Sequence, residues 1–255
     1  MTLLTGRHAL VTGANRGIGA AIAQVLSQNG AAVSLLVRNR EAGEAVQAKL
    51  PGKSCVVVAD ISNEEAIWRA CAAATQELGI VDILVNNAGS VESAPFMRSS
   101  PALFERMMAV HLYGPLHCIR ALMPPMMAEG FGRIVNIASV AGVAGAPYVT
   151  AYCSAKHAMV GLTRSLAKEA IAHGVTVNAV CPGYTDTDLV TQGVAAISAR
   201  TGRSTEDATR MLLAHNPLRR LITPEEVASS VLWLCSDGAA SVTGQTIIID
   251  GGELA

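Results

Sequence analysis

The stretch Thr12-Gly-Ala-Asn-Arg-Gly-Ile-Gly19 follows a short apolar run, His8–Val11, and opens a segment whose apolar residues recur at helical spacing. Glycines at positions 13, 17 and 19 allow a tight turn and a close approach of the backbone to a pyrophosphate, whose charge a helix N-terminus favours. Such a cluster can also be an ordinary strand-to-helix turn. The order of strand, glycines and helix favours dinucleotide binding.

Outward from this stretch, short runs rich in Val and Ile alternate with helical patterns along the whole chain. This alternation predicts a doubly wound parallel α/β sheet that is buried on both faces. Ser62–Glu65 and Thr223–Glu226 have the pattern of capping boxes that begin helices. The expected strands are His8–Val11, Ala32–Val37, Cys55–Val58, Ile83–Val85, Arg133–Ala138, Thr176–Val180 and Thr246–Ile249.

Composition fits a single domain over residues 1–255. The chain has 255 residues, of which 51% are hydrophobic and 15% charged, enough to bury one large core. The net charge of −1 and the lack of a basic block argue against a nucleic-acid partner. The longest apolar stretch, Ile134–Pro147, is too short to span a membrane. Six dispersed cysteines show no metal-ligand spacing, so we expect no metal, and the N-terminus lacks a signal segment, so we expect a cytoplasmic protein.

A second pattern concerns chemistry. Tyr152 and Lys156 are four residues apart and would share one face of a helix, and Ser139 lies thirteen residues before the tyrosine. A nearby cation favours the phenolate and would lower the tyrosine pKa, and a serine hydroxyl can polarise a carbonyl oxygen. The pair alone is weak, because this spacing also arises by chance on solvated helix faces.

The chain resembles the short-chain dehydrogenase/reductases from about Gly6 to Gly252. Five motifs occur in the order and spacing of that family: Thr12–Gly19, Asn86-Asn-Ala-Gly89, Ser139, Tyr152-x-x-x-Lys156 and Pro182-Gly183-x-x-x-Thr187. The resemblance implies a single Rossmann-type sheet of about seven strands with helices on both faces. It also implies a nicotinamide cofactor, with Ser139, Tyr152 and Lys156 as catalytic residues.

Charge at the end of the second expected strand bears on which cofactor binds. An acidic residue there grips the ribose hydroxyls in NAD-binding folds, but this strand is followed by Arg38-Asn39-Arg40. Arg38 and Arg16 could pair with a 2′-phosphate, so we expect NADP(H) rather than NAD(H). Both arginines could also be solvated surface residues. The complete expected cofactor set is Gly13, Asn15, Arg16, Gly17, Ile18, Gly19, Arg38, Asp60, Ile61, Asn86, Ala88, Gly89, Tyr152, Lys156, Pro182, Gly183 and Thr185.

His111 stands where many family members carry an asparagine that anchors a water relay to the lysine. A histidine can hold a water or pass a proton, and an ordinary pKa near 6.5 would add pH dependence. His111 could instead only fill the helix kink and pack. We include it in the catalytic set with Ser139, Tyr152 and Lys156.

The resemblance places Ser139, Val140, Tyr148 and Tyr184 around the substrate, with a mobile lid around residues 188–216. This environment carries little charge. Three arginines of the lid, Arg200, Arg203 and Arg210, could meet an anionic substrate tail, although solvated surface positions are the simpler interpretation.

Within the family, the chain looks most like bacterial 3-oxoacyl reductases and 3-hydroxyacyl or 3-hydroxybutyrate dehydrogenases. Carrier-dependent reductases present arginines where this chain has Glu129-Gly130 and His173-Gly174, which favours a coenzyme A thioester or free ketone. We therefore expect an NADP(H)-dependent reductase of 3-oxoacyl thioesters or similar ketones. Two alternatives are an NAD-dependent catabolic dehydrogenase of a cyclic or aromatic secondary alcohol and a non-catalytic dinucleotide-binding protein.

The resemblance also implies a homotetramer. A methionine-rich helix from about Leu103 to Met127 and the helix that carries Tyr152 would pair across a dimer. Methionines at such spacing are otherwise ordinary core residues.

Overall fold

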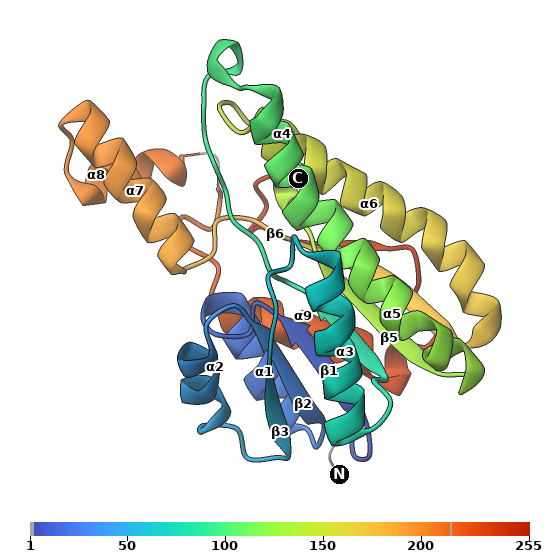
Figure 1. Cartoon of the computed structure of the whole chain (residues 1–255). Helices are drawn as coiled ribbons and strands as arrows, with labels where there is room; N and C mark the ends of the chain where they lie inside the picture. Colours follow the sequence, from blue (N-terminus) through green and yellow to red (C-terminus); the bar gives the residue numbers. More distant parts are fainter. Residues whose placement is uncertain (1–2, 215) are drawn as a thin grey trace.

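In the computed structural model, seven strands form one parallel sheet with helices on both faces (Figure 1). The strand order is β3-β2-β1-β4-β5-β6-β7. The structure describes residues 3–214 and 216–255, and for Leu189, Ala196, Ile197 and Arg200 it describes the backbone alone. The predicted fold class is confirmed.

All seven predicted strands form, with ends that differ by at most two residues from the expected ones. The strands are β1 (His8–Thr12), β2 (Ala32–Val37), β3 (Ser54–Val58), β4 (Ile83–Asn86), β5 (Gly132–Ile137), β6 (Val175–Pro182) and β7 (Thr246–Ile249). The described helices are α1 (Gly17–Gln28), α2 (Arg40–Gln47), α3 (Glu64–Leu78), α4 (Pro101–Met108), α5 (Gly114–Ala128), α6 (Thr150–Ala170), α7 (Asp188–Thr201), α8 (Thr205–Leu212) and α9 (Pro224–Cys235).

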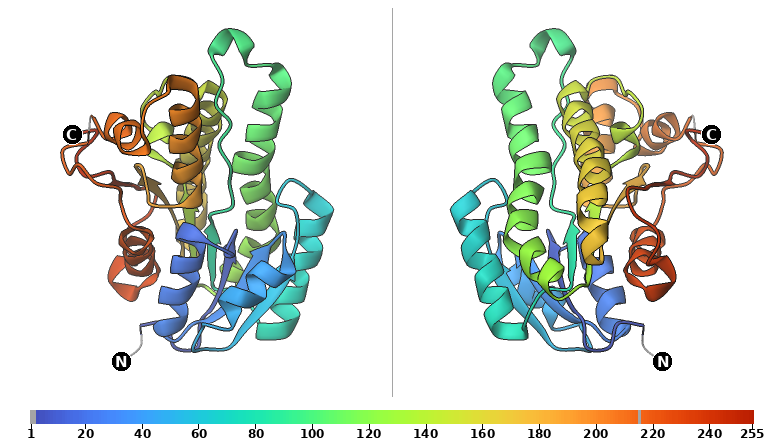
Figure 2. Two further views of the ribbon diagram at one scale, coloured as in Figure 1. Left: turned by 90° about the vertical axis from the view of Figure 1, so that its left-hand side faces the viewer. Right: turned by 90° about the vertical axis from the view of Figure 1, so that its right-hand side faces the viewer.

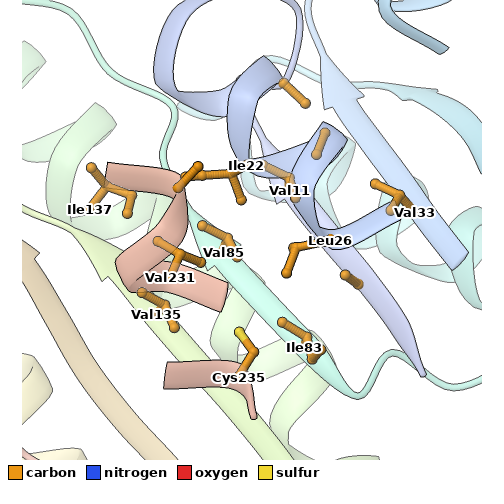
Figure 3. Close-up of a cluster of buried hydrophobic side chains, with 14 of the residues drawn as sticks. Val11, Ile22, Leu26, Val33, Ile83, Val85, Val135, Ile137, Val231 and Cys235 are labelled. Carbon is orange, nitrogen blue, oxygen red and sulfur yellow. The ribbon is translucent and has the colours of Figure 1, made fainter. Parts of the chain in front are cut away.

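Side chains of each strand alternate between two cores, one on each face of the sheet. Val11 and Val85 pack against Ile22 and Leu26 of α1 and Val231 of α9 (Figure 3). Their strand neighbours Leu10 and Leu84 pack on the opposite face against α3, α5 and α6. Figure 2 shows the helices as layers on either side of the sheet. Burial on both faces explains why these strands read as continuous apolar runs.

Because every strand is parallel, the carboxyl ends of all seven lie at one edge of the sheet. The chain order reverses between β1 and β4, since β2 and β3 lie to one side of β1 and the later strands to the other. Such a reversal leaves a crevice beyond the strand ends, which is where ligands bind in doubly wound sheets.

The two predicted capping boxes have different outcomes. Thr223 and Glu226 form one at the start of α9, with the threonine hydroxyl and the glutamate carboxylate each bound to a backbone N–H. The prediction for Ser62–Glu65 was wrong by one residue. Asn63 caps α3 by accepting from the N–H of Ala66, while the Ser62 hydroxyl donates to Asp60 instead. Ser62 has a carboxylate two residues before it, and that acceptor competes successfully for its hydroxyl.

The methionine-rich helix expected from Leu103 to Met127 is a continuous run through α4 and α5 that contains a wider π-helical turn, Ala109–Tyr113. π-Turns of this kind are often found at functional sites. Within the described residues, no helix is both long enough and apolar enough to cross a membrane.

Candidate functional site

Ser139, Tyr152 and Lys156 meet at the carboxyl edge of the sheet. Ser139 follows β5, and the other two occupy the first turns of α6. The Ser139 hydroxyl is a hydrogen-bond partner of the Tyr152 phenol. The Lys156 ammonium donates to the carbonyl oxygen of Ile137 at 2.7 Å and lies 5.6 Å from the centroid of the Tyr152 ring. A strand end and a helix start therefore bring together three residues that are up to seventeen positions apart.

Burial governs the charges of this corner. It raises the pKa of Tyr152 to about 12, against the opposing effect of the Ser139 hydrogen bond. It lowers the pKa of Lys156 to about 8. The sequence predicted that the Lys156 ammonium holds the pKa of Tyr152 below its ordinary value, and this prediction was wrong. The phenolate of Tyr152 and the ammonium of Lys156 both lose hydration in the same enclosed space, so burial disfavours both charged forms. The phenol is therefore protonated at neutral pH and is able to donate.

His111 lies in the π-helical turn and packs edge-on against Tyr152, with the ring centroids 5.1 Å apart. Its Nε2 is 2.7 Å from the carbonyl oxygen of Ser90 and therefore carries the proton of a neutral ring. The other ring nitrogen, Nδ1, is buried and has no hydrogen-bond partner within the described structure. It presents a free acceptor beside the tyrosine.

The expected titration of His111 near neutral pH was wrong. Burial, followed by the nearby Lys156 charge, lowers the pKa of His111 to about 3. The imidazole is neutral throughout the physiological range. Gly89 leaves the space that the ring occupies, because a Cβ at that position would lie 2.6 Å from His111 Cε1.

The glycine loop, residues 13–19, has the shape of a phosphate cradle. Gly13 and Gly17 adopt positive φ angles of 67° and 52°. A Cβ at Gly13 would lie 2.8 Å from the Cα of Ala88, and one at Gly19 would collide with the carbonyl oxygen of Gly13. At the start of α1, Arg16 provides no side-chain cap, so the first amide N–H groups keep their donors for a ligand. These features fit a dinucleotide pyrophosphate.

Two residues that the sequence analysis did not single out hold this loop in place. The Thr12 hydroxyl accepts from the N–H groups of Asn87 and Ala88 at 2.9 and 3.0 Å. The Asn87 amide donates to the carbonyl oxygens of Thr12 and Gly13. The signal was present in the threonine just before the first glycine and in the paired asparagines.

Asn86, a member of the expected cofactor set, turns its side chain into the protein. It is 2% exposed and donates to Asn136 at 2.9 Å, and Asn136 in turn donates to Thr163 of α6. The Asn86 side chain therefore ties β4 to β5 and α6. Ala88 and Gly89, by contrast, follow β4 into the crevice beside Gly13 and His111.

Arg38 and Asp60 follow the ends of β2 and β3 at the far side of the crevice. Asp60 accepts from the backbone and the hydroxyl of Ser62 at 2.8 and 2.6 Å, and these bonds, with a smaller contribution from Arg38, lower its pKa. Arg38 forms no ion pair with the described residues. Ile61 is buried against Gly114. Asn15 and Ile18 lie in the glycine loop itself.

The segment after β6 closes the opposite side. Gly183 donates to Ile249 of β7, and the buried Thr185 pairs with Ile222 and donates from its hydroxyl to Gly183. Tyr184 is half-buried; burial raises its pKa, and the nearby Glu253 carboxylate raises it further. This path brings Pro182, Gly183 and Thr185 to the same carboxyl edge as the glycine loop.

Tyr148 forms part of an open pocket of about 280 Å³ with Ser93, Ala94 and Pro95. It has a positive φ of 66°, unusual for a residue with a large side chain. Its carbonyl oxygen accepts from the N–H of Ala94 at 2.8 Å, which joins the loop after β4 to the loop before α6. Val140 begins a short 3₁₀ turn, Val140–Gly142, directly after Ser139.

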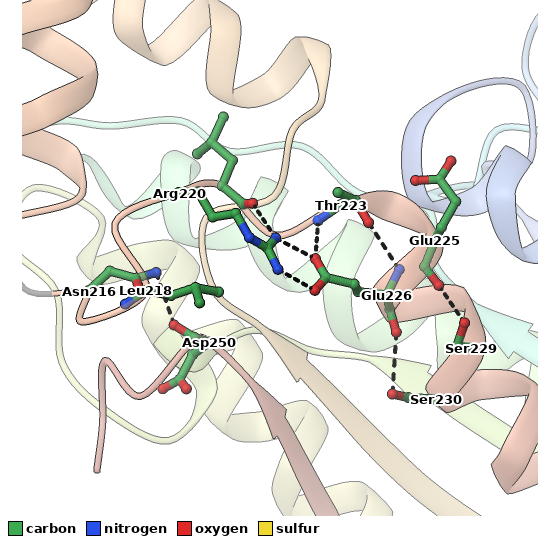
Figure 4. A network of polar contacts seen from close by, with 10 residues as sticks. Asn216, Leu218, Arg220, Thr223, Glu225, Glu226, Ser229, Ser230 and Asp250 are labelled. Atoms are coloured by element: carbon green, nitrogen blue, oxygen red, sulfur yellow. Dashed lines mark hydrogen bonds and ion pairs between the residues drawn. The ribbon is translucent and has the colours of Figure 1, made fainter.

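The segment 188–216 carries α7 and α8 and extends from the sheet edge (Figure 1). Its C-terminal end is tied at the base, where Asn216 donates to the carbonyl oxygen of Asp250 at 3.0 Å, and just beyond it Arg220 donates two hydrogen bonds to Glu226 (Figure 4). Arg203 contacts the Met211 sulfur and Arg210 pairs with Asp207. The side chain of Arg200 lies outside the described part.

Comparison with known proteins covers nearly the whole chain. A family model described as enoyl-(acyl carrier protein) reductase matches residues 13–253. Nodulation protein G of Rhizobium sp. strain N33 is 41% identical over 249 residues, which cover 98% of this chain and 97% of that protein. The 3-oxoacyl-(acyl-carrier-protein) reductase FabG of Haemophilus influenzae is 37% identical over 249 residues, 98% of each chain.

A solved structure agrees with these relatives. A point variant of actinorhodin polyketide ketoreductase, crystallised with NADPH, superposes with a TM-score of 0.93 at 34% identity and covers 97% of both chains. The likeness therefore extends to the sheet, both helical layers and the segment beyond β6.

Proposed function

The chain belongs to the short-chain dehydrogenase/reductase family, and from that premise we propose that it reduces a 3-oxoacyl thioester or a similar β-keto substrate with NADP(H). It is an NAD(P)-dependent oxidoreductase that interconverts a ketone and a secondary alcohol. The observation that carries the proposal is the junction of Ser139, Tyr152 and Lys156 beside the glycine loop, at one edge of the sheet.

In the reduction direction, Tyr152 donates the proton to the substrate oxygen. Its raised pKa keeps the phenol protonated at neutral pH, and positioned acids of this kind contribute about 10²–10⁴-fold to the rate. The Ser139 hydroxyl, already directed at the phenol, holds the same oxygen in place. When bound, the nicotinamide supplies the hydride.

Lys156 acts through its position. Its ammonium, fixed on the carbonyl oxygen of Ile137, stabilises the negative charge that remains on Tyr152 after proton donation. The neutral ring of His111 offers Nδ1 as an acceptor next to the tyrosine, where it can hold a water that returns the proton. His111 thereby takes the relay role in a form that does not titrate near pH 7.

The cofactor is held by the residues around the crevice. The glycine loop would take the pyrophosphate, Asp60 and Ile61 would border the adenine, and Ala88, Gly89, Pro182, Gly183 and Thr185 would border the nicotinamide half. Arg16 and Arg38 support NADP(H), because both are cations and no carboxylate directly follows β2. The NADPH in the solved ketoreductase agrees with this choice.

A coenzyme A thioester or a free ketone suits the surface better than a carrier-bound substrate. Glu129 and His173, where carrier-dependent relatives present arginines, are exposed, and between them the backbone of Gly130 and Gly174 is in close contact. An acidic carrier would meet a carboxylate there. Tyr148, Tyr184 and Val140 give the substrate mostly apolar surroundings.

The proposal also covers the domain organisation, the cellular compartment and the oligomeric state. Residues 1–255 form one domain with a substrate lid, residues 188–216; residues 1, 2 and 215 lie outside the described part. The enzyme is a cytoplasmic homotetramer that pairs through the continuous α4–α5 run and α6. Six free cysteines, five of them buried, suit a reducing compartment. Light scattering at micromolar concentration tests the tetramer, and a monomer would contradict it.

The decisive experiment offers NADPH or NADH with acetoacetyl-coenzyme A, a free β-ketoester and an aryl methyl ketone, and follows loss of the reduced cofactor. Fast NADPH oxidation with the thioester is expected. Turnover confined to NADH and the ketones would replace the proposal with a catabolic alcohol dehydrogenase. Cofactor binding without turnover of any substrate would favour a non-catalytic role.

A further inference from the structure

An ion pair joins the glycine loop to the lid. Arg16 Nη1 lies 3.0 Å from Asp188 Oδ2, and both side chains are 63% exposed. Beside this pair, the Thr187 methyl group packs on Gly17, where a Cβ would lie 3.1 Å from Thr187 Cγ2. The start of the lid therefore rests on the loop that would hold the cofactor phosphates.

Each partner of this pair sits at the N-terminal end of a helix. Arg16 is the N-cap of α1 and Asp188 is the first residue of α7. The helix dipole favours a carboxylate in the first turn, so it stabilises the negative charge of Asp188. Arg16 is one of the two cations, with Arg38, that our proposed function directs to the 2′-phosphate of NADP(H). The same guanidinium thus has two anionic partners.

We infer that Asp188 is a specificity-determining residue, whose carboxylate competes with the 2′-phosphate of NADP(H) for Arg16 and so limits the preference over NAD(H). This inference rests on the proposed function. A phosphate monoester carries about −1.5 to −2 charges at pH 7, so it must displace the carboxylate or bear its repulsion. Either event loosens the first turn of the lid. NAD(H) has no such group and leaves the Arg16–Asp188 pair in place.

The size of the effect follows from exposure. Exposed ion pairs are weak and are screened by salt, so removal of Asp188 should change affinity about two- to five-fold at low ionic strength. The change should shrink near about 0.15 M salt, where the screening length is about 8 Å.

The test measures dissociation constants for NADPH and NADH by calorimetry, independent of turnover, in the wild type and Asp188→Asn. We expect about two- to five-fold tighter NADPH binding and unchanged NADH binding. Asp186→Asn is the matched control. It removes the same charge two residues away, from an exposed position without an ion pair in the described structure, and should change neither constant.

Three outcomes would overturn the inference: equal shifts for both cofactors, weaker NADPH binding, or an identical effect of Asp186→Asn. In an Arg16→Ala background, Asp188→Asn should lose most of its effect on NADPH. Failure of the proposed function would be visible separately, because a wild type that prefers NADH would contradict the cofactor assignment. The response of NADPH affinity to Asp188→Asn would still decide the role of Asp188.

Discussion

The glycine loop and the lid lie side by side at the carboxyl edge of the sheet but are held by different kinds of contact. The loop is fixed by buried bonds from Thr12 and Asn87 and by glycines that leave no space for a Cβ. The lid is tied at its base, through Asn216 and Arg220, and otherwise meets the loop through an exposed ion pair.

This difference indicates that the lid tolerates substitution better than the glycine loop does. Each contact of the loop depends on its neighbours, so one added methyl group disturbs several buried bonds. The exposed contacts of the lid are worth little individually, and the segment can be altered or can move without loss of the core. The proposed function thus assigns cofactor binding to the rigid region and substrate access to the adaptable one.

The largest effect is expected at the chemical centre of the rigid region. Tyr152→Phe removes the proton donor but keeps the ring that packs on His111. Turnover should fall by about 10²–10⁴-fold, with NADPH affinity retained. Steady-state kinetics and calorimetry measure the two separately. Unchanged turnover would contradict the assigned chemistry.

Next in size is an added methyl group in the loop. Gly19→Ala forces a Cβ against the Gly13 carbonyl and the Asn87 amide, which should cost about 1–3 kcal/mol of unfolding free energy, as overpacked sites do. We also expect at least a roughly tenfold loss of NADPH affinity, the equivalent of about 1.4 kcal/mol. Urea unfolding and calorimetry report these changes. A wild-type result in both would show that the loop is as tolerant as the lid.

A smaller effect concerns pH and His111. The folded pKa of about 3 lies below the ordinary 6.5, so the unfolded chain binds the extra proton between these values and unfolding free energy falls as pH drops through that window. His111→Asn should flatten this dependence by up to about 1.4 kcal/mol per pH unit. His8, whose pKa burial also lowers, leaves a residual slope.

Urea unfolding at several pH values from about 4 to 6.5 measures the dependence on His111, because this range lies between the folded and ordinary pKa values. His173→Asn is the control, because His173 is exposed at the surface. If His111→Asn and the wild type had the same slope, the buried, neutral state of the imidazole would be wrong.

The smallest effect is expected in the lid. A Cβ at Gly193 of α7 would meet no described atom within 4 Å, so alanine there should only improve the helix, by about 0.5–1 kcal/mol. Hydrogen exchange of the α7 amides should slow by about two- to five-fold, with NADPH affinity unchanged. If Gly193→Ala weakened NADPH binding as much as Gly19→Ala, the lid and the glycine loop would not differ in their tolerance of substitution.

Several features were determined by the sequence itself. Short Val- and Ile-rich runs predicted the seven strands, and the glycines after His8–Val11 marked the cradle, because both depend on local conformation and burial pattern. The spacing of Tyr152 and Lys156 was enough to place them on one helix face. The Ser62 cap was missed by one residue, because Asp60 competes for its hydroxyl in a way that pattern alone does not show.

Tertiary structure decided the rest. The charges of Tyr152, Lys156 and His111 depend on how much water the fold removes around them, which no local pattern contains. The inward turn of Asn86, the support from Thr12 and Asn87, and the Arg16–Asp188 contact join residues up to 172 positions apart. Such pairs exist only once the sheet order has brought separate strand ends to one edge, because the chain alone does not bring them into contact.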